Sequence, residues 1–277
     1  MRLPRRHAGA WRKTALTVLW IAILFIYLFP YTWMVMTGFR KPIDTLTMPP
    51  KLIFSPTLDG FRYIFQTTHF QVYLLHSVIV ATASTLCVIA LATPAAYALA
   101  HLQMRSGAFL FAVLLARMVP GIAIVVPIYL IASRLGQLDT FDVLIVIYTA
   151  FNLPFAIWLL RSFFREIHHE LREAAMIDGG SEFSVFRRIM LPLVAGGVVA
   201  TSVFVFIAAW NEFLFALVLT NSHAATAPLA TLGFRNEFGI QWGAIGAAAL
   251  LISTPVIAFA TFMQRYLVRG LTMGSIK

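Results

Sequence analysis

The chain has 277 residues, of which 60% are hydrophobic and only 12% are charged. An ordinary soluble domain carries about a quarter charged residues, so this composition excludes that class and indicates a protein surrounded by lipid. Lysine and arginine number 21 against 11 acidic residues, but they lie mainly in short connections between apolar runs and form no nucleic-acid-binding stripe. A single cysteine, Cys87, excludes an intrachain disulfide, and the seven scattered histidines lack metal-ligand spacing.

Six apolar segments are long enough to cross a bilayer, which takes about 20 residues in a helix. They cover residues 15–36, 72–100, 108–132, 143–160, 193–219 and 242–267. The first follows a basic start, but its apolar stretch is too long for a signal peptide, and Phe29 and Trp33 stand where small cleavage-site residues belong. We therefore predict an all-α polytopic protein with an N-terminal segment 1–14, a six-helix transmembrane domain 15–267 and a tail 268–277.

The basic residues predict the orientation of these spans. With a cytoplasmic N-terminus, fourteen of the 21 lysines and arginines fall on the cytoplasmic side and six fall outside, while Arg117 lies within the third span. Cytoplasmic loops of membrane proteins carry such an excess. Both termini are therefore expected in the cytoplasm.

The connection over residues 161–192 is a polar cytoplasmic insert that differs from the other, shorter loops. It is predicted to form two short helices, one over 165–178 that ends at Gly179 and Gly180, and one that Ser181 caps and that stops before Pro192. Phenylalanines 183 and 186 and Met190 recur at i, i+3 and i+7, which predicts one apolar stripe on the second helix.

The insert resembles the EAA motif of permeases from ABC importers. The matching residues are Glu173, Ala174, Ala175, Asp178, Gly179, Phe186, Ile189, Leu191 and Pro192. Residues 210–213 and the tail 268–277 are similar to the second permease subunit of maltose-type carbohydrate importers. The resemblance runs from about residue 70 to the end, whereas the first seventy residues match in layout only. One departure is His76-Ser77, where relatives commonly carry Asn-Ser.

This resemblance implies a type I ABC importer permease fold in the plasma (inner) membrane of a bacterium. It implies that the insert is a helix-turn-helix loop that couples to a cytoplasmic ATPase. It implies four kinds of partner: a second, homologous permease subunit, two ABC ATPase subunits, an extracellular sugar-binding protein that meets the external loops, and membrane lipid. It also implies alternating access for a di- or oligosaccharide or a related polyol. The tail is implied to reach between the ATPases, although a flexible, glycine-containing end is also often disordered.

Nucleotide chemistry is not expected in this chain. The sequence contains no Gly-Lys dipeptide and therefore no GxxxxGK[ST] loop, whose amides and lysine would hold phosphates. We expect no cofactor here, with ATP and Mg²⁺ bound by the partner subunits, and no enzyme activity of the chain by itself.

Four residues are candidates for lining the translocation pathway. Arg117 and Glu212 are ionisable within predicted spans, where such groups usually face a bundle interior or water. Trp210 offers an aromatic face and Asn211 an amide, which together suit a sugar ring and its hydroxyls. Each has a structural alternative: Arg117 snorkels or pairs, Glu212 bonds to a neighbouring helix, and Trp210 belongs to the interfacial aromatic belt.

Two rival functions come from other classes of transport protein. An ion-coupled secondary transporter would need an internal repeat and buried ion-binding groups, and a channel would need a selectivity filter or a ring-forming motif. The sequence displays neither set of features, which favours the importer permease.

Overall fold

In the computed structural model, residues 6–272 are described, except for 46, 48, 50, 103–110, 112–114, 116, 117, 237 and 238. The elements before the first gap of several residues are α1 (Arg6–Gly38), α2 (Pro42–Thr45), α3 (Asp59–Arg62), the π-helix η1 (Tyr63–Thr67) and α4 (Phe70–His101). The middle of the chain contains α6 (Gly121–Arg134), α7 (Phe141–Arg165), α8 (His169–Ile177), α9 (Glu182–Val185), the π-helix η2 (Phe186–Met190), α10 (Leu191–Leu193) and α11 (Ala195–Trp210). The remaining elements are α12 (Leu214–Leu219), α13 (Ala227–Ala230), the 3₁₀-helix η3 (Thr231–Phe234), β1 (Arg235–Asn236), β2 (Gly239–Ile240) and α14 (Trp242–Thr272).

The apolar segments form long helices, as predicted. Within the described residues, four helices are long and apolar enough to cross a membrane, and these are Trp11–Gly38, Phe70–His101, Phe141–Arg165 and Trp242–Thr261. A fifth candidate is the pair Glu182–Leu193 and Ala195–Trp210, which is bent by 75°. The expected third span is described only as the 14-residue helix α6, so the count of six stays a prediction.

The contacts divide the chain into two compact units, and the first consists of residues 1–69 and 233–253. Its helices contact one another at glycines. A Cβ on Gly246 of α14 would lie 2.4 Å from the backbone nitrogen of Gly38 in α1, and a Cβ on Gly60 of α3 would lie 2.5 Å from the carbonyl oxygen of Gly243 in α14. The backbones of α1, α3 and α14 can approach this closely only because these positions lack a side chain. A two-residue antiparallel ladder, with Arg235 opposite Ile240, is the strand structure of this unit among the described residues.

The first unit also buries a cation. Arg40 is 3% exposed, and its guanidinium carbon lies 4.4 Å from the ring centre of Trp33 and 4.9 Å from that of Phe54. Two aromatic faces attract a buried guanidinium electrostatically. These contacts hold the segment around Phe54 against the end of α1.

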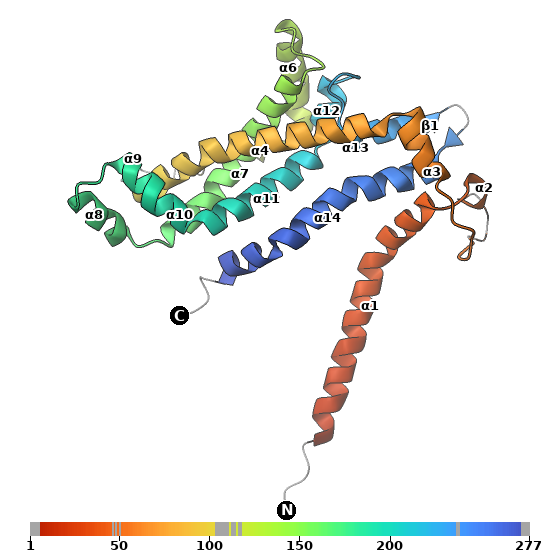
Figure 1. The fold of residues 1–277 in the computed structure, drawn as a ribbon, viewed down its shortest axis with the longest axis horizontal. Coiled ribbons are helices and arrows are strands. Elements are labelled where there is room, and N and C mark those ends of the chain that lie inside the picture. Colours follow the sequence, from red (N-terminus) through yellow and green to blue (C-terminus); the bar gives the residue numbers. More distant parts are fainter. Residues whose placement is uncertain are drawn as a thin grey trace, which may run out of the picture. The chain divides into compact units, whose positions relative to one another are not determined.

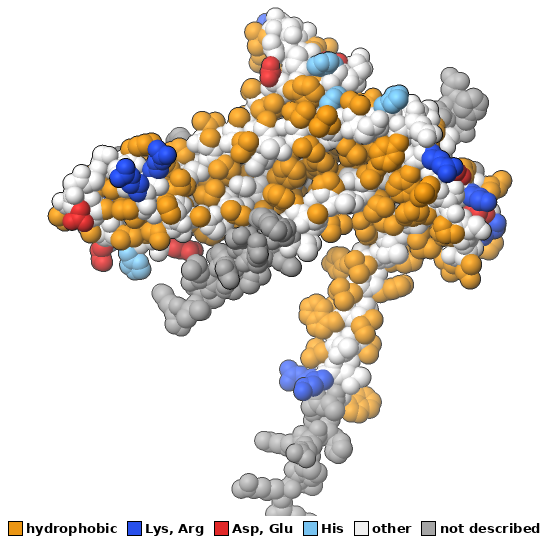
Figure 2. All heavy atoms as spheres, viewed as in Figure 1, with side chains coloured by type: hydrophobic (Ala, Val, Ile, Leu, Met, Phe, Trp, Pro, Cys, Tyr) orange, Lys and Arg blue, Asp and Glu red, His pale blue; other side chains and the backbone are white. Residues whose placement is uncertain are grey.

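The second unit consists of residues 70–232 and 254–277, and its centre is formed by α4, α7 and α11. Figure 1 shows these three helices side by side, with α8–α10 at one end of the group and α12 and α13 at the other. Close packing of α11 on α7 requires Gly197, because a Cβ there would lie 2.5 Å from the ring of Phe163. Figure 2 shows apolar side chains along the flank of this group and charged side chains at the end formed by α8–α10, as expected for a bilayer-spanning bundle.

Two helix boundaries differ from the sequence-based predictions. The second helix of the insert was predicted to stop before Pro192, which is wrong: helical structure continues through η2 and α10 to Leu193, and the direction changes at Val194. Pro192 lies two residues before the bend at Val194, and a proline removes a backbone hydrogen bond and is a common cause of such a bend. The fifth predicted span, 193–219, is not one helix, because the chain leaves helical geometry between Trp210 and Leu214.

Candidate functional site

The predicted insert forms two short helices joined by a tight turn. α8 ends in a motif in which the N–H of Gly180 donates to the carbonyl of Ala175 at 3.0 Å and the N–H of Gly179 donates to that of Met176 at 3.1 Å. Gly179 has a φ of +83°, which a side chain rarely adopts, and a Cβ on Gly180 would lie 2.8 Å from the Ala175 oxygen. Both glycines are therefore required by this turn.

The second helix begins as the sequence predicts. The hydroxyl of Ser181 accepts a hydrogen bond from the backbone N–H of Ser184 at 3.3 Å, which satisfies one of the free amides at the start of α9. The N–H of Val185 donates to the carbonyl of Ser181 at 2.9 Å. The Ser181 cap is thus confirmed, and it fixes where the second helix starts.

An ion pair joins the two helices of the insert. The guanidinium of Arg172 on α8 donates to both carboxylate oxygens of Glu182 on α9, at 2.9 and 2.7 Å. Hydrogen bonding to Glu182 raises the pKa of Arg172. Because this two-point contact matches the planar guanidinium to the carboxylate, it fixes the orientation of α8 relative to α9.

The insert divides its side chains between the bundle and the solvent. Val185 and Met190 are buried in the cluster formed with α4, α7 and α11, and Phe186 and Ala175 pack against that cluster. The predicted stripe is wrong at Phe183, which is 69% exposed, because the π-turn of η2 and its flanking residues bring Val185 rather than Phe183 to the inner face.

The solvent-facing side of the insert carries most of the motif. Glu173, Ala174, Asp178, Gly179 and Pro192 are exposed, whereas Ile189 and Leu191 are half-buried. Exposed apolar side chains accompany them, with Leu171 at 44%, Ile177 at 85% and Phe183 at 69%. A small apolar surface with an adjacent carboxylate is suited to contact another protein.

Two of the four candidate pathway residues, Trp210 and Glu212, have structural roles. Trp210 is 1% exposed and stacks on Phe206, with ring centres 5.7 Å apart. Glu212 accepts hydrogen bonds from the backbone N–H groups of Leu214, Phe215 and Ala216 at 3.0–3.4 Å, so its carboxylate caps the start of α12.

The remaining candidates are Asn211 and Arg117. Asn211 is exposed, and its amide nitrogen donates to the carbonyl of Ile207 at 2.8 Å. Arg117 lies outside the described residues. Lining of the pathway by any of the four stays a prediction.

The opposite end of the second unit contains an anchor that the sequence analysis did not single out. Asp139, between α6 and α7, accepts hydrogen bonds from the backbone N–H groups of Asn221, Ser222, His223 and Ala224, all at 3.0–3.2 Å. Burial would raise the pKa of Asp139, but these four donors together lower it to about 2. The backbone of Asp139 has a φ of +58°, in the left-handed region that residues other than glycine rarely adopt.

Two further side chains hold the same loop. The hydroxyl oxygen of Ser77 accepts from the N–H of Ala227 at 2.8 Å, and Nδ1 of His76 lies 3.0 Å from the carbonyl oxygen of Ala225. Since a carbonyl only accepts, Nδ1 of His76 carries the proton in this contact. The His76-Ser77 pair therefore fixes the loop that follows α12.

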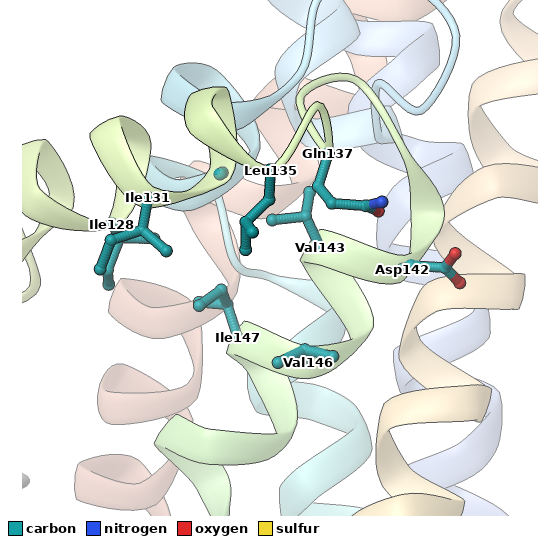
Figure 3. Close-up of a pocket in the computed structure, with 9 residues that line it drawn as sticks. Ile128, Ile131, Leu135, Gln137, Asp142, Val143, Val146 and Ile147 are labelled. Carbon is teal, nitrogen blue, oxygen red and sulfur yellow. The ribbon is translucent and has the colours of Figure 1, made fainter.

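An apolar pocket lies between α6 and α7. Figure 3 shows Ile128, Ile131 and Leu135 facing Val143 and Ile147, while the carboxylate of Asp142 points away from them. A pocket with so few polar groups offers few partners for a hydroxyl-rich molecule. Among the described residues there is also no group of three or more histidine, cysteine, aspartate or glutamate side chains arranged to hold a metal ion.

Comparison with known proteins identifies close relatives over almost the whole chain. A probable ABC transporter permease protein of Sinorhizobium fredii is 62% identical, with 96% of each chain covered. A trehalose transport system permease of Mycobacterium tuberculosis is 37% identical over 97% of this chain and 99% of its own. The trehalose/maltose permease MalG of Thermococcus litoralis is 35% identical over 93% and 94%.

The fold is also shared with a solved structure. A chain of a bacterial ABC transporter involved in the import of the acidic polysaccharide alginate superimposes with a TM-score of 0.76, covering 96% of this chain and 99% of that one, at 19% identity. Residues 89–273 match the family described as the inner membrane component of binding-protein-dependent transport systems. This chain is therefore a member of that family and a multi-pass membrane protein of the type I importer permease fold.

Proposed function

We propose that this chain is the permease subunit of an ABC importer that brings a sugar, either a di- or oligosaccharide or a related polyol, into the cell by alternating access. The observation that carries the coupling part of this proposal is the exposed side of the α8–α10 insert. Its motif residues are held by the turn at Gly179 and the Ser181 cap but leave their outer faces uncovered. The cargo rests on relatives that transport trehalose, maltose and diacetylchitobiose.

The insert is proposed to dock on a separate ATPase subunit. Glu173 supplies an exposed carboxylate for a basic group of the partner, and Ala174 lets the partner's backbone approach closely. Ile177 and Phe183 supply apolar area, which such a contact would bury. ATP and Mg²⁺ then act in the partner, and closure of the motor reaches the membrane through α8–α10.

The remaining partners follow from the architecture of such importers. A second permease chain completes the pathway, and a loaded sugar-binding protein docks on the outer loops. The rigid loop around Asn221–Ala224 is one candidate for that contact because Asp139 fixes its backbone. We propose that both termini and the insert lie in the cytoplasm, and the excess of lysine and arginine in the loops on that side supports this orientation.

Co-purification from membranes tests this proposal. The wild-type chain, Glu173→Lys and the control Glu166→Lys are compared for bound ATPase and for ATP hydrolysis stimulated by the binding protein. Glu166 is exposed at the end of α7 and lies outside the motif. The control therefore makes the same change of charge at a position that is not expected to contact the ATPase. We expect Glu173→Lys alone to lose most of the bound ATPase, because it places a cation opposite a basic partner group.

Two results would contradict the proposal. One is a wild-type chain that purifies without an ATPase and moves its cargo in response to a proton gradient, which would make it a secondary transporter. The other is equal ATPase recovery from Glu173→Lys and wild type, which would remove the motif from the docking surface.

A further inference from the structure

A side chain of a membrane span reaches into the insert. Tyr97 lies one turn before the end of α4, and its hydroxyl donates to carboxylate oxygen Oε1 of Glu182 at 2.6 Å. The same carboxylate holds Arg172 through two hydrogen bonds. One acidic group on α9 therefore joins the two helices of the insert, α8 and α9, to α4, which lies 85 residues earlier in the chain.

Apolar packing surrounds this polar link. Tyr97 is 4% exposed, and its ring lies 5.6 Å from that of Phe164 on α7 and 5.1 Å from that of Phe186 on η2. A short hydrogen bond to a charged acceptor is strong when its surroundings exclude water. The ring and the hydroxyl of Tyr97 thus hold the insert by two independent kinds of contact.

The end of α4 is also tied to α7. Nε2 of His101 lies 3.0 Å from the carbonyl oxygen of Phe164, and Nε of Arg161 donates to the carbonyl of Leu99 at 3.2 Å. A displacement of α9 that reaches Tyr97 is therefore passed to two neighbouring spans rather than to one. Such contiguous packed contacts are what mechanical coupling needs.

We propose that Tyr97, Glu182 and Arg172 form a clamp that makes the insert and the inner end of α4 move as one body during transport. Tyr97 is the positioning residue: it is buried, and it acts through Glu182. This inference rests on the proposed function, because it names the route by which motor closure reaches the spans. The motif residues contact the motor, and the clamp passes their displacement into the bundle.

The test is the ratio of sugar imported to ATP hydrolysed, measured in proteoliposomes with the full complex and a saturating binding protein. Tyr97→Phe keeps the packed ring and removes only the hydroxyl. We therefore expect ATP hydrolysis to continue while the sugar imported per ATP falls roughly tenfold, the change in an equilibrium constant expected when one hydrogen bond to a charged group is lost. Tyr129→Phe is the matched control, since Tyr129 is an exposed tyrosine of α6. It should keep the wild-type ratio.

A double-substitution cycle separates the clamp from general destabilisation. Glu182→Gln should lower the ratio as well, and Tyr97→Phe combined with Glu182→Gln should be no worse than the more impaired single variant, because the pair acts as one unit. Multiplicative losses in the combined variant, or a wild-type ratio in Tyr97→Phe, would overturn the clamp. A purely structural role would lower the amount of folded complex and leave the ratio unchanged.

Failure of the clamp and failure of the proposed function give different results. If the clamp is wrong, Tyr97→Phe transports normally, and the ATPase still co-purifies with both the wild type and Tyr97→Phe. If the proposed function is wrong, the wild-type chain itself brings down no ATPase, and no import depends on ATP.

Discussion

The insert and the loop after α12, at opposite ends of α4, α7 and α11, are held by different kinds of hydrogen bond. In the insert, side chains bond to a side chain, as in the contact of Arg172 and Tyr97 with Glu182. In the loop after α12, four successive backbone amides donate to the carboxylate of Asp139. Bonds to the backbone fix the path of a loop whatever its side chains are, whereas bonds between side chains fix the angle between helices. The loop after α12 is thus fixed along its backbone, and the insert is fixed in the angle between its two helices.

Removing the charge at Asp139 is expected to have the largest effect on stability. Asn tolerates the left-handed backbone of this position, so Asp139→Asn tests the hydrogen bonds and not the strain. Asn offers one acceptor oxygen where Asp offers two, and its NH₂ group faces N–H donors. We expect a loss of about 2 kcal/mol or more in the free energy of unfolding, the scale of hydrogen bonds to a charged acceptor. Thermal unfolding in detergent, followed by tryptophan fluorescence, measures the change.

The control for this variant is Asp142→Asn. Asp142 is exposed in the first turn of α7, where the helix dipole favours an acid only weakly. Asp142→Asn should therefore shift the melting temperature far less than Asp139→Asn does. Equal shifts would mean that the loop anchor contributes no more than an ordinary surface carboxylate at a helix start.

Acid should remove the same contribution without any substitution. The pKa of Asp139 is lowered from 3.8 to about 2 in the folded chain, so its stabilising effect is complete above about pH 4 and is lost as the pH falls through 2. The melting temperatures of wild type and Asp139→Asn are therefore expected to converge between about pH 5 and pH 2, because Asn does not titrate. A constant difference over that range would show that Asp139 is not ionised in the anchor.

The insert was predictable from sequence to a greater extent than the loop after α12. The positions of the turn at Gly179 and the cap at Ser181 follow from local residue chemistry, which acts over three or four residues. Asp139 could not be identified in this way, since its four partners lie 82–85 residues away and are backbone groups that no motif records. Glu212 was noticed as an ionisable residue in an apolar run, but its function as the cap of α12 depends on a helix break that hydropathy does not reveal.

The spans show the same division between local and long-range information. Continuous apolar runs gave the four long helices with errors of a few residues at α4 and α7, because hydropathy and helix length are properties of the segment itself. The bend at Val194 and the burial of Val185 in place of Phe183 depend on packing against α4 and α7. Tyr97 was not selected for the same reason, as its partner is 85 residues away.

The smallest effect on stability is expected at the turn of the insert, where Gly179→Ala changes one methyl group. Space is not limiting, since no atom lies within 4 Å of the position where a Cβ would stand. The cost comes from the φ of +83°, which an alanine adopts only with about 1 kcal/mol of strain. Gly196→Ala is the matched control, because Gly196 has equally open surroundings but lies within α11, where alanine is favoured over glycine. A lower melting temperature for Gly179→Ala and an unchanged or higher one for Gly196→Ala is the expected pair of results. If Gly179→Ala also weakens stimulated ATP hydrolysis by more than its loss of stability explains, that result would show that the angle set by this turn matters for docking. If both variants instead have the same melting temperature, the insert tolerates a different turn. Its orientation is then fixed by the Arg172–Glu182 ion pair.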